Sequence, residues 1–240
     1  MVRRKSFVNR QKQILIVVAL IVATLLAFLT IKTVTDEGAQ GDFIEGVHYT
    51  VLDQPRRIRG DKIEVMEFFS YGCIHCYRFD DDLEQWAGER SNQVQLKRTP
   101  LIGSDLWRLY GEHFYTLEGL DAPENLHQAT FRALHDLGRN INTPDALADF
   151  VATNSDFERD SYLLQRGSPA VARQVALSDR LARTAKITSV PQLVIQGRYR
   201  ISTTTDVGPQ RMLEVADYLI EKLSKENASS SKAQASTGKS

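Results

Sequence analysis

The two cysteines of this 240-residue chain stand in one Cys-x-x-Cys motif, Cys73-Ile74-His75-Cys76. The motif follows an apolar run, Ile63–Phe69, whose composition is typical of a strand covered largely on both faces. An amphipathic helical pattern begins within the motif. A cysteine at a helix N-terminus is favoured as a thiolate, and a second one turn on is close enough to form a disulfide. The pattern predicts a dithiol at a strand-to-helix junction, which requires an α/β fold.

The spacing of the cysteines also fits two other interpretations. Half of a zinc site is one, but zinc takes four ligands, usually from two such pairs, and the sequence has no second cysteine pair. Two unrelated structural thiols are the other, and these have no reason to share one helical turn. Redox chemistry is therefore favoured.

Basic residues are concentrated at the N-terminus. The chain has 30 basic and 30 acidic residues, yet no acidic residue precedes Asp36. The first twelve residues include five basic ones, Arg3, Arg4, Lys5, Arg10 and Lys12. Without these five, 25 basic residues remain against 30 acidic ones, and a mildly acidic body gives no support to nucleic-acid binding.

An apolar run of 18 residues, Ile14–Ile31, follows the basic cluster and is broken only by Thr24 and Thr30. It is long enough to cross most of a bilayer, with the basic residues on the cytoplasmic side. A buried core helix and a cleaved signal peptide are the alternatives. The apolar core of a signal peptide is usually shorter, about 7–15 residues, and no Ala-x-Ala site follows this run. We expect residues 1–31 to be a cytoplasmic segment and an uncleaved transmembrane signal anchor.

The rest of the chain divides into segments of different character. A short linker precedes a mixed α/β region, a helical block interrupts it, and strand signals then return as a hairpin around Gln196-Gly197, followed by a last helix. Residues rich in Ser, Ala and Lys end the chain and predict a disordered tail. The expected segments are 32–42 for the linker, 43–102 and 181–225 for the two parts of the α/β domain, 103–180 for the helical insertion and 226–240 for the tail.

The segment Glu67-Phe68-Phe69-Ser70-Tyr71-Gly72-Cys73-Ile74-His75-Cys76-Tyr77-Arg78-Phe79, with the distant Ser189-Val190-Pro191, resembles the DsbA family of bacterial periplasmic thiol oxidases. The resemblance extends from about Phe43 to Lys225. It implies a thioredoxin fold with an inserted helical domain, here preceded by one transmembrane helix. Together with the expected anchor over Ile14–Ile31, it predicts a single-pass protein of the bacterial inner membrane with its catalytic domain in the periplasm, or a soluble periplasmic protein if the signal is cleaved.

The resemblance assigns roles around the motif. Cys73 would form mixed disulfides with substrates, Cys76 would be its less accessible partner, and Ile74 and His75 would tune the Cys73 thiolate. The family commonly has proline where Ile74 stands, which leaves the reduction potential open. Pro191 would be the cis-proline beside the disulfide, and Val190 would offer backbone groups to a bound substrate.

Glu67 and Lys97 match a buried acid and a lysine that help proton movement around the second cysteine in the family. A strand-edge glutamate and a solvated lysine without contact are the alternative. Asp80-Asp81-Asp82 is read as a solvated helix face. The spacing of His113, His127 and His135 shows no ligand pattern, so we expect surface or core histidines and no metal.

These features predict a monomeric thiol:disulfide oxidase that has no cofactor besides its Cys73–Cys76 disulfide. Its partners would be folding secreted proteins with free thiols and a DsbB-type membrane reoxidant linked to quinone. A reductase or isomerase of the same fold, or a metallochaperone that binds Cu(I), are the alternatives. Only three methionines and scattered histidines are available to support copper binding.

Overall fold

The computed structural model describes residues 43–122 and 125–237. The expected anchor over Ile14–Ile31 and the linker over 32–42 lie outside these residues. Within the described ranges, no helix has the length and apolar character needed to cross a membrane.

The centre of the fold is a five-stranded sheet in the order β1-β5-β4-β2-β3. Strand β2 pairs in parallel with β3, and all the other pairs are antiparallel. All seven residues of β2 are buried, as expected for a strand covered on both faces. The hairpin predicted around Gln196-Gly197 is confirmed as β4–β5. The strands are β1 Thr50–Val51, β2 Ile63–Phe69, β3 Val94–Pro100, β4 Gln192–Ile195 and β5 Tyr199–Ser202.

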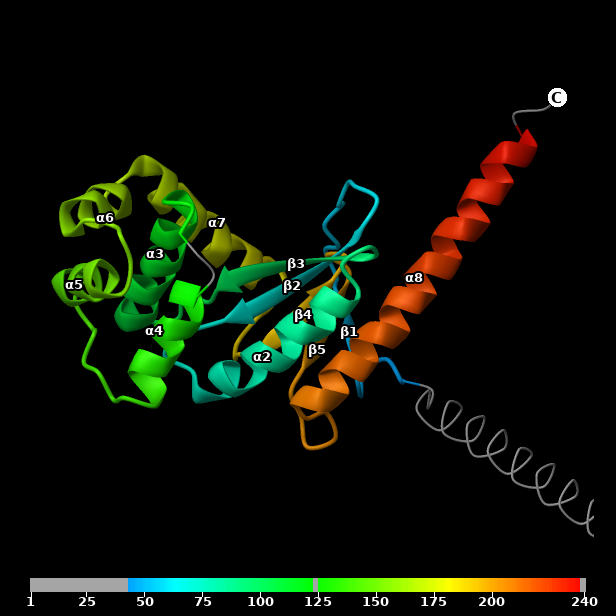
Figure 1. Cartoon of the computed structure of the whole chain (residues 1–240). Helices are drawn as coiled ribbons and strands as arrows, with labels where there is room; N and C mark the ends of the chain where they lie inside the picture. The colour runs from blue at the N-terminus through cyan, green and yellow to red at the C-terminus, as the bar shows by residue number, and fades with distance from the viewer. Residues whose placement is uncertain (1–42, 123–124, 238–240) are drawn as a thin grey trace, which may run out of the picture. The chain divides into compact units, whose positions relative to one another are not determined.

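Helices cover both faces of the sheet (Figure 1). On one face, α2 (Ile74–Glu89) and α8 (Pro209–Thr237) bury a core that includes Val65, Phe79 and Leu219. On the opposite face, the end of α7 (Pro169–Thr184) packs on Met66, Phe68 and Val194. The side chains of β2 alternate between the two cores, so neighbouring residues of this strand belong to different layers. This alternation decides which groups can meet beneath the dithiol.

The helical insertion has a core of its own and lies beside the sheet in Figure 1. Its helices are α3 (Asp105–Gly119), α4 (Asn125–His135), α5 (Pro144–Asn154) and α6 (Arg159–Arg166), together with the first part of α7. The expected helix start at Thr143-Pro144 is confirmed, since Thr143 Oγ1 accepts a hydrogen bond from Ala146 N at 3.2 Å. A further core of mostly aromatic side chains joins the insertion to the end of β2.

The C-terminus differs from the expected disordered tail. Helix α8 continues from Pro209 to Thr237 and so extends into residues 226–237 of the expected tail. Two causes are visible in the described part of the chain. Residues 225–237 contain no glycine or proline, the strongest helix breakers, and Arg198 Nη1 donates to Glu226 Oε2 at 2.7 Å where the tail begins. The boundaries expected for the insertion, 103 and 180, stay predictions, although α7 itself runs on to Thr184.

Candidate active site

The dithiol lies where β2 ends and α2 begins. Cys73 N donates to Ser70 O at 3.0 Å, which closes the turn after the strand. Cys73 is the N-cap residue of α2, and its Sγ accepts a hydrogen bond from Cys76 N at 3.4 Å. A Cβ at Gly72 would stand 3.0 Å from Nε1 of Trp107, so a side chain there would press against that ring. The sulfur of Cys73 therefore caps the helix, as the sequence predicted.

The two thiols differ sharply in environment. The two cysteines are not bonded to each other, so the structure corresponds to the reduced form. A hydrogen bond with the Cys76 side chain lowers the pKa of Cys73 to about 6 against the opposing effect of burial, and the backbone groups of Cys76 and His75 and the charge of His75 add to the lowering. Cys76 is completely buried, and burial raises the pKa of its thiol. The Cys73 thiol is therefore the one that ionises readily near neutral pH, while the Cys76 thiol stays protonated.

The low pKa of Cys73 makes the stability of the reduced protein depend on pH. A thiol with a pKa of about 6 when folded and 9.0 when unfolded stabilises the fold fully above pH 9. This stabilisation is lost as the pH falls through 6. We therefore expect the free energy of unfolding of the reduced form, relative to the oxidised form, to rise between about pH 6 and pH 9.

Denaturant unfolding of both redox forms at each pH measures this difference. The oxidised form is the control because it retains Glu67 and lacks only the thiol titration. Thiolate absorbance in the ultraviolet gives the midpoint directly. An absorbance midpoint near 9, the value of an ordinary thiol, would contradict the prediction.

Val190 and Pro191 lie against the dithiol, in the segment between α7 and β4. The Val190–Pro191 peptide bond is cis, as the sequence resemblance predicted. Val190 O lies 3.6 Å from Cys73 Sγ. The side chain of Val190 packs against both the core at the end of β2 and the core under α7. Two segments more than a hundred residues apart in the sequence are thus brought into contact at the reactive sulfur.

Ile74 and His75, the two residues between the cysteines, point away from the core. His75 is exposed, and Ile74 is 36% exposed. Trp107 lies over Gly72, which directly precedes the motif, and over Gly103. The sequence alone did not indicate Trp107 as part of the site. The two glycines that make room for its ring were the available signal.

Glu67 is buried as predicted, at 1% exposure, but Lys97 is not its partner. Parallel pairing places Lys97 opposite Met66 and Arg98 opposite Glu67, so Lys97 belongs to the other face of the sheet and is exposed. The basic group near the acid is Arg98, with Nε 3.7 Å from Glu67 Oε2. Burial raises the pKa of Glu67 to about 8, while Arg98 opposes this shift. The expected pairing of Glu67 with Lys97 is wrong because it missed the side-chain alternation of β3.

Asp80 also differs from expectation, because it is buried rather than solvated. It stands four residues after Cys76 and three before Leu83, both fully buried, so helical periodicity could have revealed its position. Its Oδ1 accepts from Arg98 Nη2 at 3.0 Å and lies 3.1 Å from Nε2 of His127. Although burial alone raises the pKa of Asp80, these two partners lower it, and the net shift is downward. Asp81, the next residue, is exposed as expected.

The histidines of the insertion occupy core positions, with His113 and His127 buried and His135 half-buried. Burial lowers the pKa of His113 to about 3, so its ring is neutral. His113 bonds Tyr162 and Thr130, whereas His127 and His135 both reach Tyr71, two residues before Cys73. Across residues 43–122 and 125–237, no group of three or more histidine, cysteine or acidic side chains is arranged to hold a metal ion.

A thioredoxin-type sheet, a helical insertion and an N-capping cysteine define the class of thiol:disulfide oxidoreductases. No family model matches the chain. The thiol:disulfide interchange protein DsbA of Azotobacter vinelandii is 39% identical over 160 residues, 67% of this chain and 74% of that protein. DsbA of Pseudomonas aeruginosa is 34% identical over 200 residues, 82% of this chain and 94% of that protein.

Solved structures agree with these relatives. The crystal structure of Pseudomonas aeruginosa DsbA superposes with a TM-score of 0.73 at 34% identity, covering 79% of this chain and 97% of that one. DsbA from Xylella fastidiosa superposes with a TM-score of 0.69 at 26% identity, covering 78% of this chain and 98% of that one. The chain belongs to the DsbA family of thiol:disulfide interchange proteins.

Proposed function

We propose that this protein is a thiol:disulfide oxidase that donates its Cys73–Cys76 disulfide to folding periplasmic or envelope proteins. The observation that carries the proposal is the position of Cys73 Sγ at the start of α2, where hydrogen bonds from the side chain and the backbone of Cys76 lower the pKa of this thiol to about 6. A stabilised thiolate stabilises the reduced form, which makes the disulfide oxidising, and both properties are established for the DsbA family itself. Because the reduced form is the more stable one, the protein is expected to oxidise its substrates rather than reduce them.

The reaction balances as two exchange steps. A substrate thiolate attacks Cys73 Sγ of the disulfide, forming a mixed disulfide, and Cys76 leaves as a thiolate and takes up a proton. A second substrate thiolate then attacks the substrate sulfur of the mixed disulfide and releases the Cys73 thiolate. The substrate loses two electrons and gains a disulfide, while the Cys73–Cys76 pair gains two electrons.

The neighbouring residues have distinct roles in this scheme. Glu67, protonated at neutral pH with a pKa of about 8, supplies the proton for Cys76. Arg98, rather than Lys97, is the basic group that stabilises the Glu67 carboxylate once the proton has left. Val190 offers its backbone to the substrate next to Pro191, while Ile74 and His75 tune the Cys73 thiolate and contact the incoming chain.

The place of action is proposed from the sequence. The Ile14–Ile31 segment would anchor the protein in the bacterial inner membrane, with the catalytic domain in the periplasm on a linker of residues 32–42. A DsbB-type membrane protein linked to quinone would reoxidise the dithiol. The N-terminal residue of the mature protein, determined by mass spectrometry, tests the anchor. A mature protein that begins after residue 31 would show that the segment is a cleaved signal.

The reduction potential and an oxidative refolding assay together test the oxidase direction. We expect the purified full-length protein, equilibrated with glutathione, to be more oxidising than thioredoxin, whose potential is about −270 mV. The oxidised protein should also accelerate disulfide formation in a reduced test protein. A potential near that of thioredoxin without acceleration would favour a reductase, and tight stoichiometric Cu(I) binding by a redox-inactive protein would favour a metallochaperone.

A further inference from the structure

We propose that helix α4 is a clamp on the redox turn: His127, Phe131 and His135 hold Tyr71 and thereby stabilise the dithiol form. All three are positioning residues, since they act on Cys73 through Tyr71 rather than on the substrate. The inference rests on the proposed redox function of Cys73 and Cys76. The helical insertion would thus help to set the equilibrium between the dithiol and disulfide forms of Cys73 and Cys76.

The three residues form one stripe along α4, spaced by four positions, and each contacts a different part of Tyr71. Nδ1 of His127 and the Tyr71 hydroxyl share a hydrogen bond of 2.7 Å. The ring of Phe131 packs edge-on against the Tyr71 ring, with centroids 4.9 Å apart. Nε2 of His135 donates to the Tyr71 carbonyl at 2.8 Å. Tyr71 is 1% exposed, and side chains of the insertion form part of its enclosure.

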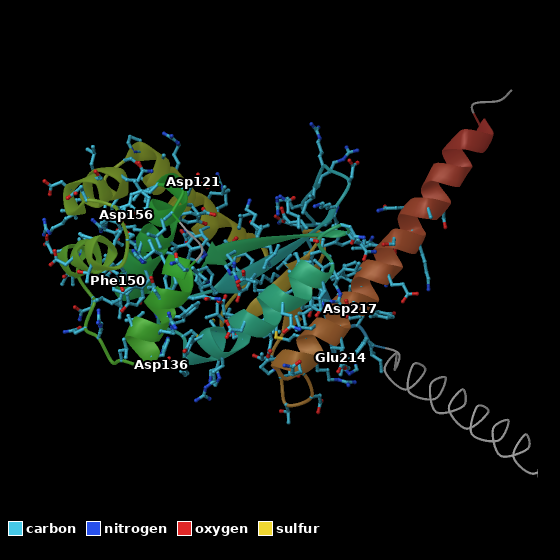
Figure 2. The ribbon with its side chains drawn as sticks, in the orientation of Figure 1. Asp121, Asp136, Phe150, Asp156, Glu214 and Asp217 are labelled. Carbon is cyan, nitrogen blue, oxygen red and sulfur yellow. The ribbon has the colours of Figure 1, made fainter. Side chains whose placement is uncertain are left out.

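Helix α4 and the residue after it also contact Tyr77, which directly follows the motif. The His135 ring stacks on the Tyr77 ring with centroids 5.4 Å apart and planes 12° apart. The hydroxyl of Tyr77 donates to Oδ2 of Asp136 at 2.6 Å, and Asp136 is labelled at the end of α4 in Figure 2. His127 further reaches Asp80 on α2. Helix α4 therefore contacts the chain shortly before Cys73 and immediately after Cys76.

The contacts of α4 with Tyr71 and Tyr77 should stabilise the dithiol form more than the disulfide form. In the oxidised protein the disulfide itself fixes Cys73 relative to α2. In the dithiol, Cys73 Sγ is held by weak hydrogen bonds, from Cys76 N at 3.4 Å and to Val190 O at 3.6 Å, so the path of the preceding turn also decides where the sulfur lies. Loss of the clamp should therefore destabilise the reduced form more than the oxidised form, and make the disulfide less oxidising.

The test measures, for three variants of the full-length protein, the equilibrium constant for the reaction in which the protein disulfide oxidises glutathione. His135→Ala removes the bond to the Tyr71 carbonyl, Tyr71→Phe removes the bond to His127, and His127→Gln changes the other partner of that bond. One hydrogen bond contributes about 1 kcal/mol, so we expect each variant to lower the constant for oxidation of glutathione by about fivefold. The pKa of Cys73, followed by thiolate absorbance, should rise in the same variants. His135→Gln, which keeps an N–H donor, should recover part of the loss.

Thr143→Ala is the matched control in the same insertion. It removes the N-cap of α5, where Thr143 Oγ1 accepts from Ala146 N at 3.2 Å, and should lower the stability by about 1 kcal/mol without changing the equilibrium constant. Equal constants for wild type and all three clamp variants would overturn the clamp. A decrease in Thr143→Ala as large as in His135→Ala would also overturn it, because any loosening of the insertion would then suffice. Absence of exchange in the wild type would instead refute the proposed function.

Discussion

A Cys76→Ser variant is expected to accumulate mixed disulfides at Cys73 and to lose turnover. Cys73 is half-buried with a pKa of about 6, so it reacts with substrate disulfides at neutral pH. In the wild type, the buried Cys76 thiol stands one turn away and resolves such an adduct within the molecule. Intramolecular attack has an effective molarity on the order of 10⁵ M or more in well-oriented systems, against millimolar external thiols. The adduct should therefore live at least about a hundredfold longer in the variant.

Non-reducing electrophoresis of acid-quenched cells measures the adducts, which mass spectrometry then identifies. Cys73→Ser is the matched control and should form none, because the remaining thiol at Cys76 is completely buried and its pKa is raised. Adducts of comparable abundance on Cys73→Ser would mean that Cys76 faces the substrate. That result would reverse the roles assigned to the two thiols.

Replacement of Asp80 by alanine is expected to cost about 3 kcal/mol of unfolding free energy, within the range for breaking a buried ion pair. Asp80 is 3% exposed and accepts from Arg98 while it contacts His127. Without it, two basic side chains keep their buried positions but lose an anionic partner. Arg98 retains Glu84, with Nη2 and Oε2 3.1 Å apart, which limits the loss. Removal of the Asp80 charge should also lower the pKa of Glu67.

Asp81→Ala is the control for this prediction, since it removes the same group one residue along the same helix. Asp81 is exposed, so its loss should change the unfolding free energy by less than about 0.5 kcal/mol. Urea denaturation of both variants at neutral pH gives the comparison. Similar small effects from both substitutions would mean that the Asp80 network adds little net stability, as happens for some buried charge clusters.

Local patterns were sufficient for most of the fold. The apolar run before the motif, the glycine turn at Gln196-Gly197 and the Thr143-Pro144 cap each depend on residues within a few positions of one another, and the structure has each of them. The C-terminal helix is the exception. Its composition predicts disorder, although residues 225–237 lack helix breakers and Glu226 is tied to Arg198 on a different element.

Local sequence patterns did not predict the charged partners of the buried acidic residues Glu67 and Asp80. The burial of Glu67 was predictable from its apolar neighbours, but its basic partner depends on the register between β2 and β3, which a single strand does not encode. The burial of Asp80 follows the helical period, yet the groups that compensate its charge come from β3 and α4. Only packing between distant segments supplies these partners.

The sequence alone determined that two thiols share one helical turn after a strand, because this arrangement is local and the helix start itself favours the first thiolate. It also indicated the family through Val190-Pro191. Tertiary structure decided what surrounds the thiols: Arg98 rather than Lys97 beside Glu67, and His127 and His135 on Tyr71. These contacts join residues that are distant in the sequence, and strand register and helix packing, rather than local pattern, bring them together.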